Sequence, residues 1–361
     1  MTKKLPKLSV LVPCYNVKKY VDQCLASIAN QTLKDIEIIC INDGSTDSTL
    51  DIIKKYADSD KRFVIIDKQN EGYGKSMNRG LDAATGEYIG IVESDDWIDA
   101  DMFENLVKIA DDANADVVKS NFFTYTTTNG ENNVLCKSLN LCPMNKVIKP
   151  MENTEVFFCT PSIWSAIYRR QFLLDNRIRF LESPGASYQD TGFNFKVWAC
   201  AERAYLTPNA WLHYRCDNEN SSVKSTGKVF CVCDEYDEIE RFLDERGTYD
   251  NDMHKLVAYL KMRTYFWNLN RLGGDARTKF GERFASEFKP IISNRYLTHR
   301  AVDDRSWYKL MILMHPRNVF YRIMRGLVNL KAAFLKKRIY GKRAIYYLFG
   351  CVPVYNKKVN N

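Results

Sequence analysis

The chain has 361 residues, of which 45% are apolar and 27% are charged, as in an ordinary globular protein. This length suits one large domain with an appendage, or two domains. The net charge of +8 is uneven, because residues 305–361 hold 13 Lys and Arg and no Asp or Glu, while the rest of the chain carries −5. A mildly acidic body with a basic tail argues against nucleic-acid binding over the whole surface.

The eleven cysteines lack the spacing of a disulfide framework or a zinc site. Only Cys231 and Cys233 lie close together in the sequence, so we expect reduced, mostly buried thiols, as in the cytoplasm. The first residues are basic, but the apolar run behind them is too short for a secretory signal. No stretch without Asp, Glu, Lys or Arg exceeds 13 residues, whereas a membrane-spanning helix needs about 20. We therefore expect no transmembrane segment.

The first half of the chain alternates short apolar runs with segments of helical periodicity. Strands are predicted at five apolar runs: 8–12, 36–41, 62–67, 87–92 and 115–120. Helices are predicted at four segments between them: 17–28, 48–56, the part of 70–84 that follows a glycine-rich turn, and 101–110. Such alternation predicts an α/β fold with a mostly parallel sheet, flanked by helices and joined by right-handed crossovers.

Three polar clusters follow three of these strands directly: PCYN (13–16), NDGSTD (42–47) and ESDD (93–96). The carboxyl ends of parallel strands meet at one edge of a sheet, where ligands bind. Each cluster by itself also has a structural interpretation. The first would be a strand exit with Asn16 as a helix N-cap, the second an Asp-Gly turn with Asp47 as a cap, and the third an acidic helix N-terminus. Their occurrence at one edge favours a binding crevice.

Carboxylates crowded on one turn are hard oxygen ligands that suit Mg²⁺ or Mn²⁺. A crevice that joins such a cation to an aromatic-bearing loop and a second acidic loop suits a nucleoside diphosphate, whose developing charge the cation would stabilise. The spacing of a P-loop is absent, because GYGKS (72–76) lacks the upstream glycine, and no G-x-G-x-x-G follows the first strand. A P-loop phosphotransferase is therefore disfavoured.

The motifs LSVLVPCYN, INDGSTDSTLDII and NEGYGKSMNRGLDAATGEYIGIVESDDWI, with YQD and HYR further on, together resemble an inverting, nucleotide-sugar-dependent GT-A glycosyltransferase of family 2. This family includes bacterial transferases of surface polysaccharides. The resemblance covers residues 7–225 and implies a GT-A (Rossmann-like) fold with Mn²⁺ or Mg²⁺ as cofactor. It also implies transfer of a sugar from a nucleotide sugar, with UDP-sugar as the first choice, to a glycan or lipid-linked glycan.

The resemblance also implies a donor-binding set on several loops. Its members are Pro13, Tyr15, Asn16, Asp43, Asn70, Lys75, Asn78, Asp96 and Arg215. The first three would lie under the nucleobase and ribose, Asp43 would hydrogen-bond the base, and Arg215 would pair with a phosphate through its guanidinium. Many members carry Ala-Arg-Asn where this chain has Ser76-Met77-Asn78, so we do not expect a diphosphate contact from that arginine position, and Lys75 is a candidate to replace it.

The metal site follows from the same resemblance. Glu93-Ser94-Asp95 occupies the place of the family's Asp-x-Asp motif, with a glutamate as a departure from the first aspartate. Asp95 is the principal metal ligand, and the longer arm of Glu93 would reach the cation or the ribose. Asp96 would position the sugar or join the metal shell. His213 is a further candidate ligand, with a packed core histidine as the alternative, and Asp99 is interpreted as the N-cap of the next helix.

An inverting transfer needs one general base that takes the proton of the acceptor hydroxyl. Family members usually show Glu-Asp where this chain has Gln189-Asp190, so Asp190 becomes the catalytic base, with a helix N-cap as the alternative. Trp164 would stack on an acceptor sugar or pack in the core. Ser221 and Ser222 would contact phosphate or stabilise a turn.

Three regions are expected: a glycosyltransferase domain at 1–225, an α-helical appendage at 226–304 and a basic amphipathic tail at 305–361. In the tail, apolar residues recur near helical spacing with basic residues between them; they are Phe320, Ile323, Met324, Leu327, Leu330 and Phe334. This pattern favours an anionic membrane surface, with nucleic-acid binding and a packing helix as alternatives. The expected location is cytoplasmic and peripheral, on the inner face of a bacterial plasma membrane.

The sequence thus predicts a metal-dependent inverting glycosyltransferase, a hexosyl- or N-acetylhexosaminyltransferase that does not act on nucleic acid. A non-catalytic nucleotide-sugar or glycan binder stays open, because Met77, Glu93 and Gln189 depart from the family pattern. A nucleotidyltransferase would need a glycine-rich basic loop after the first strand, which VPCYNVKKY lacks. A glycoside hydrolase with paired carboxylates would leave the nucleotide-type loops without a purpose.

Overall fold

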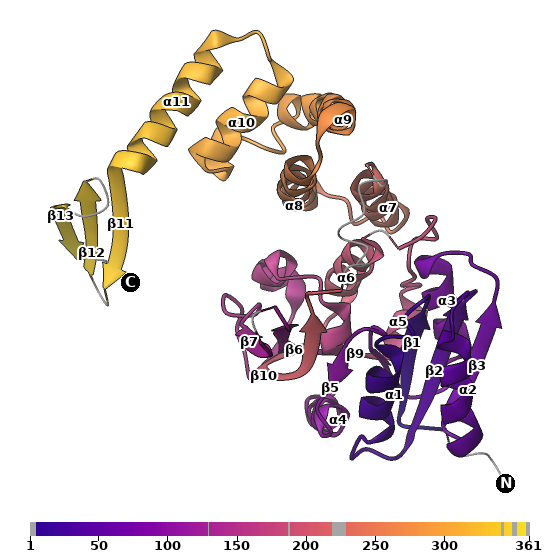
Figure 1. Ribbon diagram of the computed structural model, residues 1–361. Coiled ribbons are helices and arrows are strands. Elements are labelled where there is room, and N and C mark those ends of the chain that lie inside the picture. Colours follow the sequence, from indigo (N-terminus) through magenta and orange to yellow (C-terminus); the bar gives the residue numbers. More distant parts are fainter. Residues whose placement is uncertain are drawn as a thin grey trace. The chain divides into compact units, whose positions relative to one another are not determined.

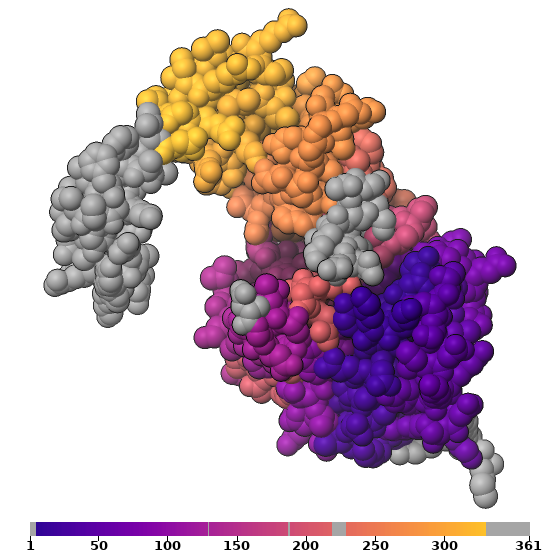
Figure 2. All heavy atoms as spheres, in the orientation of Figure 1, coloured from indigo at the N-terminus to yellow at the C-terminus, as the bar shows by residue number. Residues whose placement is uncertain are grey.

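The structure is a computed structural model that describes residues 5–128, 130–186, 188–218, 229–340, 343–348 and 352–358, with side chains to residue 329. It divides into two compact units, Met1–Arg246 and Gly247–Asn361 (Figure 1). In Figure 2 the atoms of the first unit run from indigo to red, and those of the second from orange to yellow. The first unit extends beyond the domain boundary predicted at 225, because it includes a further helix.

The core of the first unit is a sheet that begins with four parallel strands. They are β1 (Leu8–Cys14), β2 (Ile36–Asp43), β3 (Phe63–Lys68) and β4 (Tyr88–Ile91), arranged in the order β3-β2-β1-β4. Every residue of β1 is buried, since neighbouring strands and helices cover it on all sides. The four predicted strands are confirmed, and so is the fifth, β6 (Val117–Thr126), which continues well beyond its predicted end.

The predicted helices also form. They are α1 (Val21–Ala29), α2 (Thr49–Ser59), α3 (Tyr73–Ala83) and α4 (Met102–Ala113). Helix α1 buries Val21, Cys24, Leu25 and Ile28, the apolar stripe seen in the sequence. It begins later than predicted and is preceded by Tyr20 at the N-cap position, so the suggestion that Asn16 caps it is wrong.

The sheet becomes mixed in the second half of this unit. Strand β9 (Ala166–Arg169) is antiparallel to both β4 and β6, and β10 (Ala204–Arg215) is parallel to β6. The short β5 (Trp97–Ile98) pairs antiparallel with β10 and ends the order β3-β2-β1-β4-β9-β6-β10-β5. Two further strands, β7 (Asn132–Cys136) and β8 (Val147–Ile148), pair with β6 and β10. The result is the predicted α/β class.

Three helices complete the first unit: α5 (Arg170–Asp175), α6 (Gln189–Cys200) and α7 (Cys231–Glu245). Short 3-10 turns lie at Pro150–Glu152, Thr154–Phe158 and Ile163–Ser165. Helix α6 is buried almost all round, from Gly192 to Trp198. Helix α7 packs against it, and the buried Lys196 donates to Glu238 over 3.0 Å. Helix α7, in the region expected to be the helical appendage, therefore packs in the first unit.

The second unit is helical and then forms a small sheet. Its helices are α8 (Asn251–Arg271), α9 (Gly274–Ser293), α10 (Asp304–Met314) and α11 (Val319–Phe334), with a 3-10 turn at His299–Ala301. Tyr265 lies 5.2–5.9 Å, centroid to centroid, from the rings of Phe280, Phe284 and Phe288. None of the helices in the described part of the chain is both long enough and apolar enough to cross a bilayer.

The tail differs from its sequence pattern after residue 334. Three antiparallel strands follow α11, namely β11 (Leu335–Tyr340), β12 (Arg343–Leu348) and β13 (Val352–Lys358). The amphipathic period predicted a helix for the first part of the tail only. The segments IYYL and VPVY lie in β12 and β13, and their aromatic and β-branched residues favour strands rather than a helix.

Candidate functional site

The strand order places a crevice beside β1. Strands β2 and β3 lie on one side of β1, and β4 lies on the other (Figure 1). The chain therefore leaves the carboxyl ends of the neighbouring strands β1 and β4 in opposite directions. Open α/β sheets bind ligands at such a switch point. The segment 13–16 leaves β1 here, and the acidic turn 93–96 leaves β4 beside it, because Val92 still donates to Leu11 over 3.0 Å. The sequence predicted this juxtaposition.

The loops after β1 and β2 are joined by hydrogen bonds. The side-chain oxygen of Asn16 accepts from the backbone N–H of Thr46 at 2.8 Å, and the Asn16 N–H donates to the Ser45 hydroxyl at 3.0 Å. Asn16 adopts a left-handed φ of 53°, which asparagine tolerates better than most residues. Tyr15 beside it remains 50% exposed, so an aromatic ring projects from a fixed loop.

Asp43 joins the second loop to the glycine-rich turn before α3. Its carboxylate accepts from the backbone N–H groups of Glu71 at 2.9 Å and Gly72 at 3.0 Å, and from the ammonium of Lys68. Gly44 follows with a φ of 71°, and a Cβ there would lie 2.7 Å from the backbone nitrogen of Asn70. The two loops therefore approach as closely as backbone permits. Lys68, the counterion, was not predicted.

The predicted donor residues near α3 divide into two groups. Asn70 is exposed and Lys75 is partly exposed, so both are accessible to a ligand. Asn78 is buried, and its amide donates to the Phe180 carbonyl at 3.0 Å and to Glu182 at 2.9 Å. Its side-chain oxygen also accepts from the Phe180 N–H at 2.9 Å. Asn78 holds the neighbouring segment in place, and we remove it from the donor set.

The acidic turn carries three carboxyl groups, each held by a different protein partner. Glu93 accepts from the Tyr73 hydroxyl at 2.6 Å, and Asp95 accepts from the Asn218 amide at 2.8 Å. One oxygen of Asp96 accepts from the backbone N–H of Arg215 at 2.8 Å. The other, Oδ2, is buried and has no hydrogen-bond partner among the described residues. The sequence carries no signal for the roles of Tyr73, which lies in the glycine-rich motif, or of Asn218, which follows HYR.

Crowding and burial strongly perturb these acids. Burial, opposed by the Tyr73 hydrogen bond and assisted by Asp95 and Asp190, raises the pKa of Glu93 to about 8. Burial also raises the pKa of Asp95, and burial with the charge of Asp95 raises that of Asp96 well above its ordinary value. A positive ligand at this turn would relieve the repulsion.

Arg215 of β10 supports the same turn. Its Nε donates to the Asp95 carbonyl at 2.9 Å, and a terminal nitrogen donates to the Gln23 side chain at 2.7 Å. The guanidinium also lies 5.0 Å from the ring centroid of Trp97 and 5.2 Å from that of Tyr125. Arg215 thus contacts protein groups on several sides, and its main structural effect is to fix the acidic turn.

His213 lies in an aromatic stack rather than in an open ligand position. Its ring is parallel to Trp97 at 4.9 Å and nearly parallel to Phe123 at 5.0 Å. Its nitrogens lie 3.0 Å from Asn133 Oδ1 and 3.0 Å from Asp99 Oδ1. Because both nitrogens have protein partners, the structure favours the packed alternative. The interpretation of Asp99 as an N-cap is wrong, since Asp101 takes that position before α4.

Asp190 lies in the first turn of α6, one residue after Gln189. Burial raises its pKa to about 6, although the N–H of Thr191 and the charge of Lys119 oppose the shift. Gln189 donates to the Ser183 hydroxyl at 2.9 Å, which fixes the preceding loop. The N-cap position belongs to Tyr188, so the alternative role of Asp190 as a cap is excluded.

Lys119 of β6 is a buried cation near this helix that the sequence did not indicate. It is 1% exposed and donates to the Ser162 carbonyl. Burial lowers its pKa to about 7, and the charges of Cys159 and Asp190 oppose that shift. A buried amine whose pKa lies near 7 is an unusual neighbour for a buried carboxylate, and such shifted groups are typical of functional sites.

Trp164 is buried, with 8% of its surface exposed. It stacks on Tyr214 at 5.1 Å and meets Phe122 edge-on at 4.6 Å. This packing favours the core alternative over an acceptor platform. Ser221 and Ser222, the predicted phosphate contacts, lie outside the described residues.

Within the described ranges, no group of three or more His, Cys, Asp and Glu gathers as a ready metal centre. Magnesium-type sites in nucleotide enzymes use one or two carboxylates, and substrate phosphates and water complete the shell. Glu93 and Asp95 provide such carboxylates, and the unpartnered oxygen of Asp96 lies on the same turn. The residues present therefore fit a divalent cation that arrives with a diphosphate.

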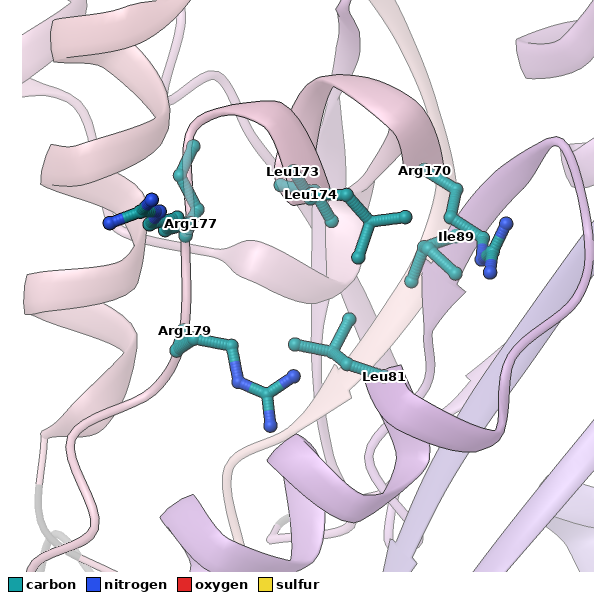
Figure 3. Close-up of a pocket in the computed structure, with 8 residues that line it drawn as sticks. Leu81, Ile89, Arg170, Leu173, Leu174, Arg177 and Arg179 are labelled. Carbon is teal, nitrogen blue, oxygen red and sulfur yellow. The ribbon is translucent and has the colours of Figure 1, made fainter.

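Among the hollows formed by described residues, two lie outside this crevice. One, of about 200 Å³, is lined by Leu81, Ile89, Arg170, Leu173, Leu174, Arg177, Ile178 and Arg179. Figure 3 shows Leu81 and Leu174 pointing toward one another across it. Another, of about 590 Å³, lies at the amino ends of β1 and β4, beside Lys7 and Glu87. Neither contains a predicted site residue, so the candidate site rests on the strand ends and not on these hollows.

The comparisons with known proteins agree with this geometry. The family model for glycosyl transferase family 2 matches residues 9–175. A Bacillus subtilis protein described as putative glycosyltransferase EpsH is 30% identical over 269 residues, 73% of this chain and 77% of its own length. The uncharacterized glycosyltransferase EpsJ of B. subtilis is 34% identical over 231 residues, 60% of this chain and 63% of its own length. The chain belongs to glycosyltransferase family 2.

Among solved structures, S. aureus TarS 1–349 in complex with UDP-GlcNAc aligns with a TM-score of 0.67. It is 20% identical and covers 98% of this chain and 100% of that chain. At this identity the likeness shows the fold, which is the predicted GT-A type. The protein is thus a glycosyltransferase.

Proposed function

We propose that this protein transfers a sugar from a UDP-sugar to a hydroxyl group of a glycan or lipid-linked glycan, with inversion and with a divalent cation. One observation carries the proposal. The hydrogen-bonded loops after β1 and β2 and the acidic turn 93–96 lie at the same switch point of the sheet, and Asp190 is close enough to act on Glu93 of that turn. The TarS complexes with UDP-GlcNAc and UDP favour uridine as the base. The surface-glycan acceptor follows from the family resemblance.

The loops after β1 and β2 would bind the nucleoside. Tyr15 is exposed beside Pro13 and would pack on the base, while Asn16 keeps the loop in position through Thr46. Asp43 is oriented by two backbone N–H groups and would accept from the base, in the manner of an amide-recognising carboxylate. Asn70 and Lys75 lie in the adjoining segment, where an ammonium would approach the diphosphate.

Asp95 and Glu93 would hold the divalent cation, which when bound supplies charge neutralisation on the departing diphosphate. Asp96 would contact the sugar or complete that shell through its unpartnered oxygen. Arg215 fixes the turn by donating to the Asp95 carbonyl and thereby sets the direction of both carboxylates. We leave His213 out of this set, because its ring nitrogens have protein partners.

Asp190 would act as the general base. It would accept the proton of the acceptor hydroxyl while that oxygen attacks the anomeric carbon from the face opposite the leaving diphosphate. A pKa of about 6 leaves this carboxyl ionised at neutral pH yet more basic than an exposed aspartate. Its place on a buried helix turn limits the water that would compete with the acceptor.

The screen that tests this function measures thermal stability of the full chain with UDP-, GDP-, CMP- and dTDP-sugars, each with and without Mn²⁺. A ligand that binds the folded state raises the melting temperature. We expect a shift with a UDP-sugar that requires Mn²⁺, together with slow release of UDP. Stabilisation by a GDP-sugar alone would overturn the uridine assignment, and a metal-independent shift would overturn the cation.

We also propose that α11 attaches the enzyme peripherally to an anionic membrane. Val319, Phe320, Ile323 and Leu327 are 54–64% exposed, and Arg322 is exposed between them. An apolar stripe with basic flanks is the pattern of an interfacial helix. Flotation with vesicles of phosphatidylglycerol should recover the protein, whereas F320S/I323S/L327S should remain unbound. Equal recovery with neutral phosphatidylcholine vesicles, or full recovery of the triple variant, would contradict membrane attachment.

A further inference from the structure

Helix α7 contributes a buried carboxyl group to the neighbourhood of Asp190. Glu235 is 1% exposed, and its Oε2 accepts from the backbone N–H of Gly192 at 3.2 Å. Gly192 lies in the first turn of α6, only two residues from Asp190. The carbonyl of the N-cap residue Tyr188 accepts instead from the Thr191 N–H at 2.9 Å, so the Gly192 N–H takes an acceptor from outside the helix. Glu235 supplies it from the next helix.

The two helices approach so closely at position 192 that a side chain there would force the Glu235 carboxyl group to move. A Cβ built on Gly192 would lie 2.4 Å from Oε2 of Glu235, well inside van der Waals contact. Alanine is normally the better helix former, by about 1 kcal/mol. The glycine inside α6 therefore has a specific structural reason, which is the approach of the Glu235 carboxyl.

The surroundings of Glu235 oppose a negative charge. Its Oε1 is buried and has no hydrogen-bond partner among the described residues. The neighbouring cation, Lys196, donates to Glu238 over 3.0 Å. An isolated buried carboxylate is strongly disfavoured, and the group takes up a proton instead. Burial, with the charge of Asp190 in support and that of Lys196 opposed, raises the pKa of Glu235 to about 9.

We propose that Glu235 is a positioning residue for Asp190: a carboxyl group of α7 that holds the first turn of α6 through the Gly192 N–H and keeps water away from the catalytic base. The proposal rests on the assignment of Asp190 as the base. It extends the catalytic machinery to a helix beyond the residues 9–175 that the family model matches. The charged or titratable groups that act on Asp190, Glu235 or both include Lys119, Lys196, Glu93, Tyr73, Tyr214 and Glu238.

Two substitutions separate the charge of Glu235 from its shape. E235Q keeps an oxygen that accepts from Gly192 and stays neutral, so the rate of UDP release from the donor found in the screen should stay within about twofold of wild type. E235A removes the acceptor of the Gly192 N–H and lets the first turn of α6, with Asp190, move out of position, so the rate should fall by about tenfold or more while the KM for the donor is unchanged. D244A, on the exposed part of α7, is the matched control.

The pH profile distinguishes positioning from a loss of fold. In E235A, hydration of the cavity should lower the pKa of Asp190, so the acid limb of the rate profile should move to lower pH, whereas in E235Q it should stay in place. Equal limbs in E235A and wild type, or equal rates, would overturn the proposal. Transfer that survives in D190N would instead refute the base assignment, so the two failures are distinguishable.

A stability cycle tests the contact without any donor. G192A should destabilise the protein, against the usual preference for alanine, because its methyl group displaces the Glu235 carboxyl. In the E235A background the same change has room, so G192A/E235A should unfold at a higher temperature than the sum of the single shifts predicts. Additive shifts would show that residues 192 and 235 do not meet, and would overturn the geometry on which the proposal rests.

Discussion

The two sides of the crevice hold their polar groups in opposite ways. On the donor side, Asp43 has two backbone donors and the ammonium of Lys68, and Asn16 is bonded across to Thr46. On the acidic side, an oxygen of Asp96 has no partner in the described structure, and the pKa of Glu93 is raised to about 8, chiefly by burial. The donor side is fully paired without a ligand, whereas on the acidic side Arg215 only partly offsets the crowded carboxyl groups among the described residues.

This difference indicates what each side contributes. A fully paired loop loses little entropy when a base binds, because its side chains are already in place. Buried carboxyls with raised pKa values destabilise the folded chain, and such groups gather where they take part in binding or catalysis. Substitutions on the donor side should therefore lower stability and binding together, whereas those on the acidic side should lower activity and leave stability unchanged or improved.

The largest effect is expected for D190N. Removing the base should lower the rate of sugar transfer by about 10²–10⁴-fold, since a positioned general base contributes that much. Binding of UDP with Mn²⁺, measured by calorimetry, should not weaken, because Asp190 lies on α6 outside the donor loops and the loss of its charge lowers the pKa of Glu93. A variant that transfers sugar at the wild-type rate would remove Asp190 from the mechanism.

D95A should have the next largest effect. Losing the principal ligand should weaken Mn²⁺-dependent binding of UDP by at least about 100-fold, because even supporting groups around metal ligands contribute 10- to 100-fold. D112A, an exposed carboxylate on α4, is the control for charge. Calorimetry with and without Mn²⁺ measures the difference, and an unchanged metal dependence would place the cation elsewhere.

D43N probes the paired side. It removes the closer of the two carboxylates of Lys68, a nearly buried cation that keeps only Glu71 at 3.5 Å, and it faces an amide toward backbone donors, so the free energy of unfolding should fall by about 3 kcal/mol. Binding of UDP should weaken as well. Denaturant unfolding measures the loss, with the exposed D51N as control. A stable D43N protein that still binds UDP would show that the two sides do not differ as described.

The pH dependence of the wild-type enzyme should follow Asp190. Below about pH 6 the base is protonated, so the rate should fall tenfold for each further pH unit. The folded-state pKa exceeds the ordinary 3.8, so the folded chain binds this proton more tightly than the unfolded chain. Stability from this group therefore falls as pH rises from about 4 to 6 and stays lower above. D190N should lack this decline in thermal scans across that range.

Y73F should have the smallest effect. It removes only the hydroxyl that donates to Glu93 at 2.6 Å, a contact that lowers the pKa of this acid. We expect Mn²⁺-dependent binding of UDP at pH 7 to weaken by about three- to tenfold, the usual contribution of one hydrogen bond. Raising the pH should restore part of the loss. An unchanged affinity at pH 7 would show that Glu93 is not part of the metal site.

Much of the fold could be predicted from the sequence because its signals are local. The apolar runs of β1 to β4 and β6, and the periodic stripe of α1, identified elements whose burial the structure confirms. The strand ends then brought the segment 13–16 and the turn 93–96 together by topology alone. The sequence did not predict the β11–β13 sheet. The basic amphipathic pattern was taken to describe the whole tail, although the aromatic and β-branched residues after residue 334 favour strands.

The sequence by itself determined which residue types stand at the strand ends, and so which chemistry the crevice offers. Only the tertiary structure decided which side chains have protein partners. It placed His213 between two rings, turned Asn78 toward Phe180, buried Trp164 and brought Glu235 to Gly192. The physical reason is that burial and hydrogen bonding depend on neighbours from distant segments, which no local period or motif in the sequence specifies.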